Sequence, residues 1–120
     1  MADVITVLDV PVVVAAGQTK LQAVEQAIDV SGYDHLDLAI DVLGIAPTSL
    51  RILTSMTLQT EDSQWVEAAN FAGSWFNNKA NFYLSVPGSG MPLFRYIRWE
   101  IVASGGNATS VRITGMARRG

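Results

Sequence analysis

The chain has 120 residues, the usual size of one domain, so we expect a single domain over residues 1–120. Charged residues make up only 16% of it, below the share of about 25% that is typical of soluble domains. The net charge is −3, and the only basic pair, Arg118 and Arg119, is terminal, which argues against nucleic acid as a partner.

The low share of charged residues indicates that part of the surface is buried against other protein subunits, because interface cores are depleted in charge. We therefore expect a homo-oligomer, or a subunit docked on a larger protein lattice. The chain has no cysteine, so its stability must come from packing rather than from disulfides. No apolar stretch is long enough to span a membrane, so we expect no membrane partner.

The first apolar stretch, Val4 to Ala15, is expected to form a strand. Asp9 and Pro11 interrupt it and no basic segment precedes it, so we do not expect a secretory signal peptide. An unpaired apolar strand is a template for pairing with another chain. Residues 1–16 are therefore predicted to be an N-terminal arm that pairs with a partner, through the apolar side chains Val4, Ile5, Val7, Val12 and Val14.

The next segment, Ala23 to Val30, is ambiguous. Its composition favours a strand, bounded by Ser31 and Gly32. Residues 20–28 also fit the spacing of a short helix, because Leu21, Val24 and Ile28 would share one face. The strand is the preferred interpretation, and the helix is the alternative.

Two runs alternate largely between apolar and polar residues, which is the pattern of half-buried strands. From His35 to Val42 the apolar positions are Leu36, Leu38, Ile40 and Val42. From Leu50 to Gln59, one face is predicted to carry Leu50, Ile52, Met56 and Leu58.

Four more strands are expected along the rest of the chain. Two are weaker, at Trp65 to Phe71 and at Asn81 to Val86. In the third, Phe94 to Val102, the inward positions are Ile97, Trp99 and Ile101, and in the last, Val111 and Ile113 alternate with Arg112 and Thr114. The stretch Ser104 to Asn107 between these last two is predicted to be a hairpin turn. About eight short strands without a long helix predict an all-β fold, an antiparallel β-sandwich of the jelly-roll type.

Few residues could carry out chemistry. The one histidine, His35, stands near Asp34, Asp37 and Asp41, and the interpretation we favour is a solvated polar edge rather than a base or a zinc ligand. Asp37 and Asp41 are four positions apart on one strand, about 13 Å, which is too far for two ligands of one cation. We therefore assign no catalytic residue, no cofactor and no metal, and we do not expect an enzyme.

Aromatic residues gather in the middle third of the chain. Trp75 and Phe76 lie in an expected loop and precede Asn77 and Asn78, with Tyr83 in the following strand. A ring beside amide groups suits the apolar face and the hydroxyls of a sugar. Such a loop can equally pack on its own core or contact a neighbouring subunit, so Trp75 and Phe76 are candidates for a protein partner. The glycan alternative would use Trp75, Asn77, Asn78 and Tyr83.

Two segments resemble a known family. Ser55 to Trp65 places an acidic turn before a tryptophan, and Phe94 to Trp99 contains an Arg-Tyr-Ile-Arg strand. This pattern resembles the second half of discoidin-like, galactose-binding-type jelly rolls, and the resemblance covers roughly the last two thirds of the chain. In that family these residues are scaffold, so the resemblance implies the fold and not a ligand. The chain lacks the cysteine pair of the secreted members.

The stretch that begins at Val30, Val-Ser-Gly-Tyr-Asp-His-Leu-Asp-Leu, resembles small sandwich proteins encoded among the structural genes of tailed phages. That resemblance implies a non-enzymatic structural protein of a phage or virus-like particle, a capsid decoration or a head or tail accessory subunit. It implies a location in the virion, after assembly in the host cytoplasm. The alternative function is a carbohydrate-binding module that uses the loop aromatics.

Overall fold

The computed structural model describes residues 2–33, 35–45, 47–72, 81–86 and 93–118, with burial and side-chain contacts for 12–33, 35–42, 45, 47–70 and 93–115. Two 3-10 helices, η1 (Val24–Gln26) and η2 (Asp62–Gln64), lie in connections. The strands are β1 (Ala2–Val14), β2 (Thr19–Leu21), β3 (Ile28–Asp29), β4 (His35–Gly44), β5 (Ser49–Ser55), β6 (Val66–Ala72), β7 (Asn81–Val86), β8 (Tyr96–Val102) and β9 (Thr109–Arg118).

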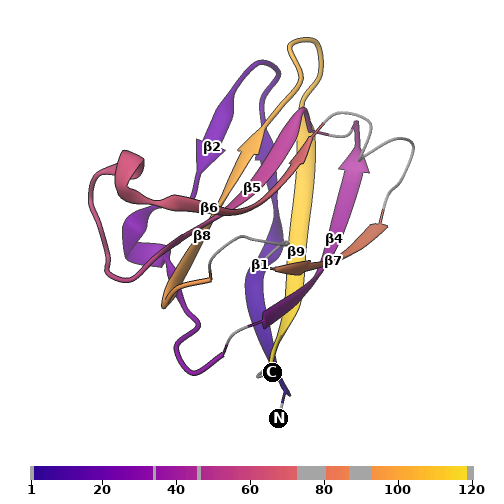
Figure 1. Ribbon diagram of the computed structural model, residues 1–120. Coiled ribbons are helices and arrows are strands. Elements are labelled where there is room, and N and C mark those ends of the chain that lie inside the picture. Colours follow the sequence, from indigo (N-terminus) through magenta and orange to yellow (C-terminus); the bar gives the residue numbers. More distant parts are fainter. Residues whose placement is uncertain (1, 34, 46, 73–80, 87–92, 119–120) are drawn as a thin grey trace.

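The strands form two antiparallel sheets that pack as a sandwich (Figure 1). One sheet has the order β1-β9-β4-β7, and the other has the order β2-β8-β5-β6, with the short β3 also paired to β8. The short β3 joins the same sheet as β2, and apart from it the chain changes sheets at every connection except the one from β5 to β6. This is the strand order of a jelly roll, so the predicted all-β antiparallel sandwich is confirmed.

The core lies between the sheets and is built by alternation. Leu36, Leu38 and Ile40 of β4 are fully buried, as are Ile97 and Ile101 of β8. Alternate residues of a strand point to opposite faces, so one apolar row per strand is enough to fill the interior. The alternation predicted for His35 to Val42 and for Ile97 to Ile101 is therefore confirmed.

The predicted inward row from Leu50 to Leu58 is only half right. Leu50 and Ile52 are fully buried, but Met56 is 64% exposed and Leu58 is 49% exposed. The reason is that β5 ends at Ser55, so the later residues of the row never reach the interior. The last inward side chain is Thr54, whose hydroxyl accepts from the Phe94 N–H at 2.8 Å and donates to the Tyr96 carbonyl at 2.9 Å.

The strand predicted over Ala23 to Val30 is wrong for most of its length. The chain forms the 3-10 helix η1 there, and only Ile28 and Asp29 pair with β8. The predicted helix over residues 20–28 is also too long, because Thr19–Leu21 pair with β8 as β2. Between these short strands Gln22 bonds to β8 through its backbone N–H, which donates to the Trp99 carbonyl at 3.0 Å.

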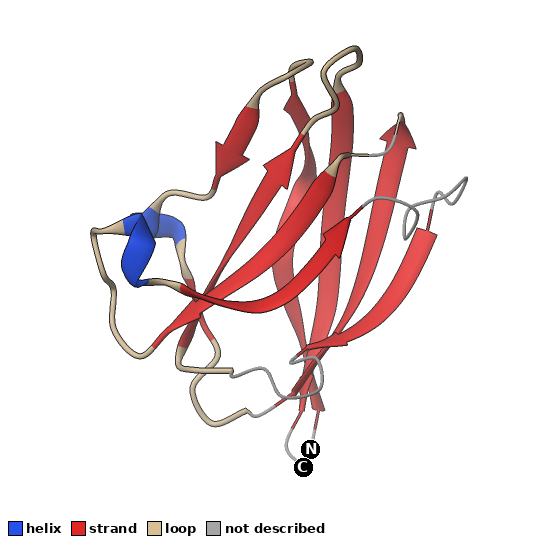
Figure 2. Ribbon diagram, turned by 45° about the horizontal axis from the view of Figure 1, so that its top comes forward, coloured by secondary structure: helices blue, strands red, loops and turns tan. Residues whose placement is uncertain are grey.

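The hairpin predicted at Ser104 to Asn107 is wrong. β8 and β9 lie in different sheets, so the connection between them crosses the sandwich instead of turning within one sheet (Figure 2). The turn itself forms, with the Ser104 hydroxyl accepting from the Asn107 N–H at 3.2 Å. Turn residues therefore marked the position of the connection correctly, but not the pairing of the strands that it joins.

Candidate interaction surfaces

The strand β1 was predicted to be an arm for a partner, and it lies at the edge of the four-stranded sheet. It pairs with β9 of its own chain, Val4 with Met116 and Ile5 with Gly115. Val14 is 2% exposed in the core, and Val12 packs against that core. One edge of β1 is therefore used within the chain, and the other has no paired strand in the described part of the sheet.

The register of β1 is broken in the middle. It is continuous from Ala2 to Thr6, shifts between Thr6 and Leu8, where Val7 lies, and shifts again between Leu8 and Val12 around Pro11. Bulges and proline are devices by which proteins protect sheet edges from pairing with other chains. Uninterrupted pairing with a partner strand is thus limited to the continuous segments at the two ends of β1.

The aromatic loop lies outside the described residues. This holds for Trp75, Phe76, Asn77 and Asn78, together with Lys79 in the same segment. Tyr83 is described by its strand position alone, opposite Ala39 in the pairing of β7 with β4. The glycan-binding prediction and the partner contact at Trp75 and Phe76 stay predictions.

Of the acidic residues near His35, Asp41 forms a contact within the fold. His35 is half-buried at the start of β4, and Asp41 forms an ion pair with Arg112 on the neighbouring β9, with a distance of 2.8 Å from Oδ2 to the guanidinium. Asp34 lies outside the described residues. No group of three or more His, Cys, Asp or Glu side chains that could hold a metal ion occurs in the described part of the chain.

The outer face of the five-stranded sheet carries a charged ladder across three strands. Arg51 of β5 donates from Nε to Glu100 of β8 at 2.7 Å, and its other side is 3.6 Å from Glu67 of β6. The hydrogen bond with Glu100 raises the pKa of Arg51 above its usual value. The one guanidinium bridges two carboxylates, so the ladder joins the three strands and keeps a net charge of −1.

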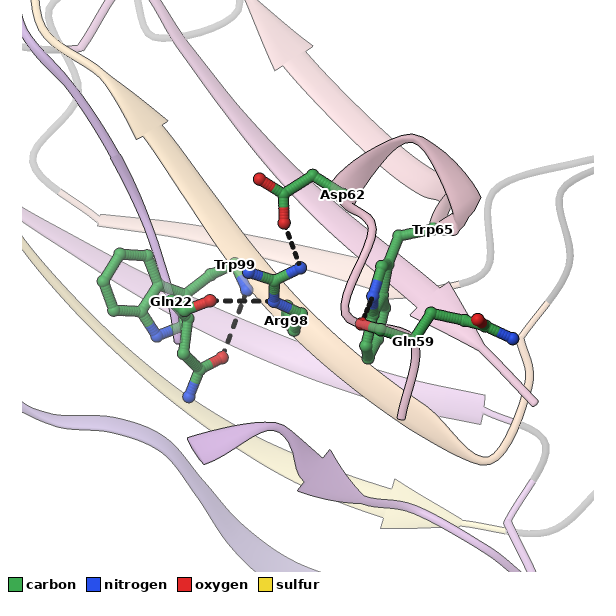
Figure 3. A network of polar contacts seen from close by, with 6 residues as sticks. All are labelled: Gln22, Gln59, Asp62, Trp65, Arg98 and Trp99. Carbon is green, nitrogen blue, oxygen red and sulfur yellow. Dashed lines mark hydrogen bonds and ion pairs between the residues drawn. The ribbon is translucent and has the colours of Figure 1, made fainter. Parts of the chain in front are cut away.

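Beside this ladder, a buried arginine joins the two connections that cover the face (Figure 3). The side chain of Arg98 is 4% exposed, donates to the Gln22 carbonyl at 2.8 Å and to Asp62 at 3.1 Å, and lies 5.0 Å from the ring centre of Trp65. The Trp65 indole N–H in turn donates to the Gln59 carbonyl at 2.9 Å. The alternation of β8 places Arg98 outward, and its burial comes from these covering connections, which the sequence pattern could not show.

One end of the sandwich is formed by the connections that follow β3 and β5 and by the segment that precedes β8, and we call it the charged end. Exposed apolar side chains alternate with charged ones there. Met56 and Leu58 follow β5, and Phe94, which precedes β8, is 37% exposed. The same connections carry Glu61 and Asp62, and Asp29 pairs with Arg95 at 3.2 Å. A partner that covered these apolar groups would also have to cover charged groups.

The opposite end contains no charge among its described residues. Three connections that the structure describes meet there, residues 15–18, residues 45 and 47–48, and residues 103–108, at the top of Figure 1. They are tied by backbone bonds from the Gly17 N–H to the Ser104 carbonyl at 2.7 Å and from the Ala103 N–H to the Gln18 carbonyl at 2.9 Å. Glycine is needed at residue 17, whose φ is +73°. We call this surface the charge-free end.

The charge-free end is built from three long segments without charged residues. Residues 10–19, 42–50 and 101–111 contain no Asp, Glu, Lys, Arg or His, and the topology brings these three segments together. Val13 is 65% exposed and Ile45 is 52% exposed at this end. The rest of the described surface there comes from small or uncharged residues of the loops. No sequence signal within one segment marks this surface, because it exists only once the three segments are adjacent.

Comparison with known proteins gave no relative: no protein-family model matches the chain, and no curated protein matches it. No helix in the described part of the chain is long and apolar enough to cross a membrane.

Proposed function

We propose that this chain is a non-enzymatic structural subunit of a phage or other virus-like particle, a capsid decoration or a head or tail accessory protein, which acts through protein–protein contacts. The observation that carries the proposal is the charge-free end, with Val13 and Ile45 exposed among uncharged loops. Interface cores are depleted in charge in the same way.

The fold supports the proposed function in a particle by analogy. Jelly rolls recur in viral capsid proteins and in lectins, and both uses depend on surfaces displayed at the ends or edges of the sandwich. The low share of charged residues, 16%, fits a chain with much of its surface against protein neighbours. The edge of β1 gives a second surface for neighbours at its continuous segments.

The test is whether the chain is part of a particle. Particles released from cells that produce the chain are separated on a density gradient, and the fractions are probed with an antibody against it. We expect the chain to sediment with the particle shell, and immunogold labelling to place it at regular positions. A chain that stays in the light fractions contradicts the proposal.

The carbohydrate-binding module is the alternative outcome of the same study. A glycan array probed with the wild-type chain and with Trp75→Ala separates the two functions. Binding to a glycan that is lost in Trp75→Ala, from a chain absent from particles, would replace the structural function with the lectin function. No glycan binding, from a chain present in the shell, supports the structural one.

A further inference from the structure

We propose that the charge-free end is the surface through which two copies of this chain bind each other. This inference deepens the proposed function and rests on it, since it names the partner and the place of one of the protein–protein contacts. It is argued from charge, exposure and topology.

Charge decides which part of the surface a second copy can cover. Each chain carries a net charge of −3, so two copies repel each other overall. In a two-fold contact the same surface is covered on both copies, so every charge on that surface loses water twice. At the charge-free end, the described residues offer no charge to be opposed or desolvated.

Exposed apolar groups supply the attraction. Val13 and Ile45 are 65% and 52% exposed, and the surrounding loops are short and held by the bonds from Gly17 to Ser104 and from Thr48 to Val102, at 2.7 and 2.8 Å. A surface with its backbone already fixed loses little conformational freedom when it binds. The polar side chains of the three connections are amides and hydroxyls, which are less costly to cover than ions.

The charged end has comparable apolar exposure and is the natural rival. Met56 is 64% exposed and Leu58 is 49% exposed, nearly the same as Val13 and Ile45. Between them and Trp65 lie Glu61 and Asp62. Two copies that met there would have to cover these carboxylates and the exposed pair of Asp29 and Arg95, whose desolvation is costly. The two ends therefore differ in charge and not in apolar exposure.

A second copy also fits better than a strongly charged partner. A basic or acidic partner gains electrostatic attraction only where it meets opposite charge, and the described residues of the charge-free end provide none. The copy is the partner for which an uncharged surface is an advantage, because such a surface adds no local repulsion to the overall repulsion between identical chains.

Because the apolar side chains at the two ends are similarly exposed, substitutions at one end are matched controls for substitutions at the other. Val13→Lys and Ile45→Lys alter the charge-free end, and Met56→Lys and Leu58→Lys are the controls at the charged end. Sedimentation velocity from about 1 µM to about 500 µM gives the dissociation constant of each dimer. Circular dichroism and thermal unfolding check that each variant is folded, as expected for substitutions of exposed residues.

We expect the wild-type chain to dimerise, both charge-free-end variants to weaken the dimer by about tenfold or more, and both controls to leave it within about twofold. A wild-type chain that is monomeric throughout, or folded Val13→Lys and Ile45→Lys chains that dimerise normally, overturns the inference. Loss of the dimer in the controls alone would move the contact to the charged end. The density-gradient result is independent of this one. If the chain is found in particles but Val13→Lys does not weaken its dimer, the proposed function stands and only this contact is wrong.

Discussion

At the residue scale, the burial of Arg98 is the least expected feature. The partners of Arg98 contribute unequally to the stability of the fold. The Asp62 side chain is 65% exposed, whereas the Gln22 carbonyl and the Trp65 ring are covered. An exposed ion pair contributes only about 0.2–1 kcal/mol, while a covered hydrogen bond to a charged group contributes about 1.5–3 kcal/mol. The contact of the Arg98 guanidinium with the covered Trp65 ring adds a further stabilising interaction.

We therefore predict that Arg98→Ala lowers the free energy of unfolding by about 2–3 kcal/mol and that Asp62→Asn lowers it by less than about 1 kcal/mol. Arg98→Lys should fall nearer to the alanine variant, because an ammonium cannot stack flat on Trp65 while donating to the Gln22 carbonyl. Urea unfolding measures all three. An Asp62→Asn variant as unstable as Arg98→Ala would show that the ion pair, and not the covered contacts, holds Arg98.

Asp29 carries a dependence of stability on pH. Its pKa lies below the usual 3.8, mainly because the Ser31 backbone N–H donates to it at 2.9 Å, with a further hydrogen bond from Arg95. A carboxyl whose pKa is lower in the folded state stabilises the fold above its unfolded pKa, and that contribution is lost as the pH falls through the folded pKa.

We predict that Asp29→Asn lowers the free energy of unfolding at neutral pH, where the variant lacks the charged carboxylate that accepts from Ser31 and Arg95, and that wild type and variant converge at acid pH, so that the loss of stability with falling pH is flatter in the variant. Urea unfolding of wild type and variant between about pH 6 and about pH 2 gives the two slopes. Parallel slopes would place the acid-sensitive carboxyl elsewhere.

At the scale of elements, β1 is a strand of the sandwich before it is an arm. Its register with β9 runs from Ala2 with Arg118 to Val14 with Thr109, and Val14 belongs to the core. Removing it would leave β9 as an open edge and expose Val111 and Ile113, which are fully buried. We predict that deleting residues 2–13 abolishes cooperative thermal unfolding, measured by circular dichroism, whereas Val13→Lys keeps it. A truncated chain that unfolds cooperatively near the wild-type temperature would show that β1 is a detachable arm and is not needed for the fold.

Elements also show where sequence patterns suffice and where they fail. The runs from Leu36 to Val42 and from Ile97 to Ile101 could be predicted because each strand buries one face against a single interior. Met56 and Leu58 continue the alternation beyond the end of β5, and alternation alone does not tell where a strand ends. Residues 20–30 divide among two short strands and η1 because long-range pairing with β8 overrides local preference.

At the scale of the whole molecule, composition indicated a contact surface but not its place. A charged share of 16% says that some surface is poor in charge. Only the jelly-roll topology brings residues 10–19, 42–50 and 101–111 to one end, and their distance along the chain hides that from any local pattern. The existence of a surface poor in charge could thus be predicted from composition, and its position could not.

The electrostatics of the whole molecule give a last prediction, which concerns salt. Copies with a net charge of −3 repel through solvent, and salt screens this repulsion over a Debye length of about 30 Å at 0.01 M and about 8 Å at 0.15 M. A contact without ion pairs has no attraction to be screened. We therefore predict that the dimer tightens by a few-fold between about 0.02 M and about 0.5 M NaCl, measured by sedimentation velocity.

A matched variant separates this long-range effect from a general effect of salt on apolar contacts. Glu61→Lys lies in the exposed connection at the charged end and adds two positive charges, so the net charge changes from −3 to −1. If repulsion between whole chains causes the salt effect, this dimer should be tighter than that of the wild type at low salt and should respond less to added salt. Weakening of the wild-type dimer by salt would instead reveal ion pairs between the copies, which the described residues of the charge-free end cannot supply.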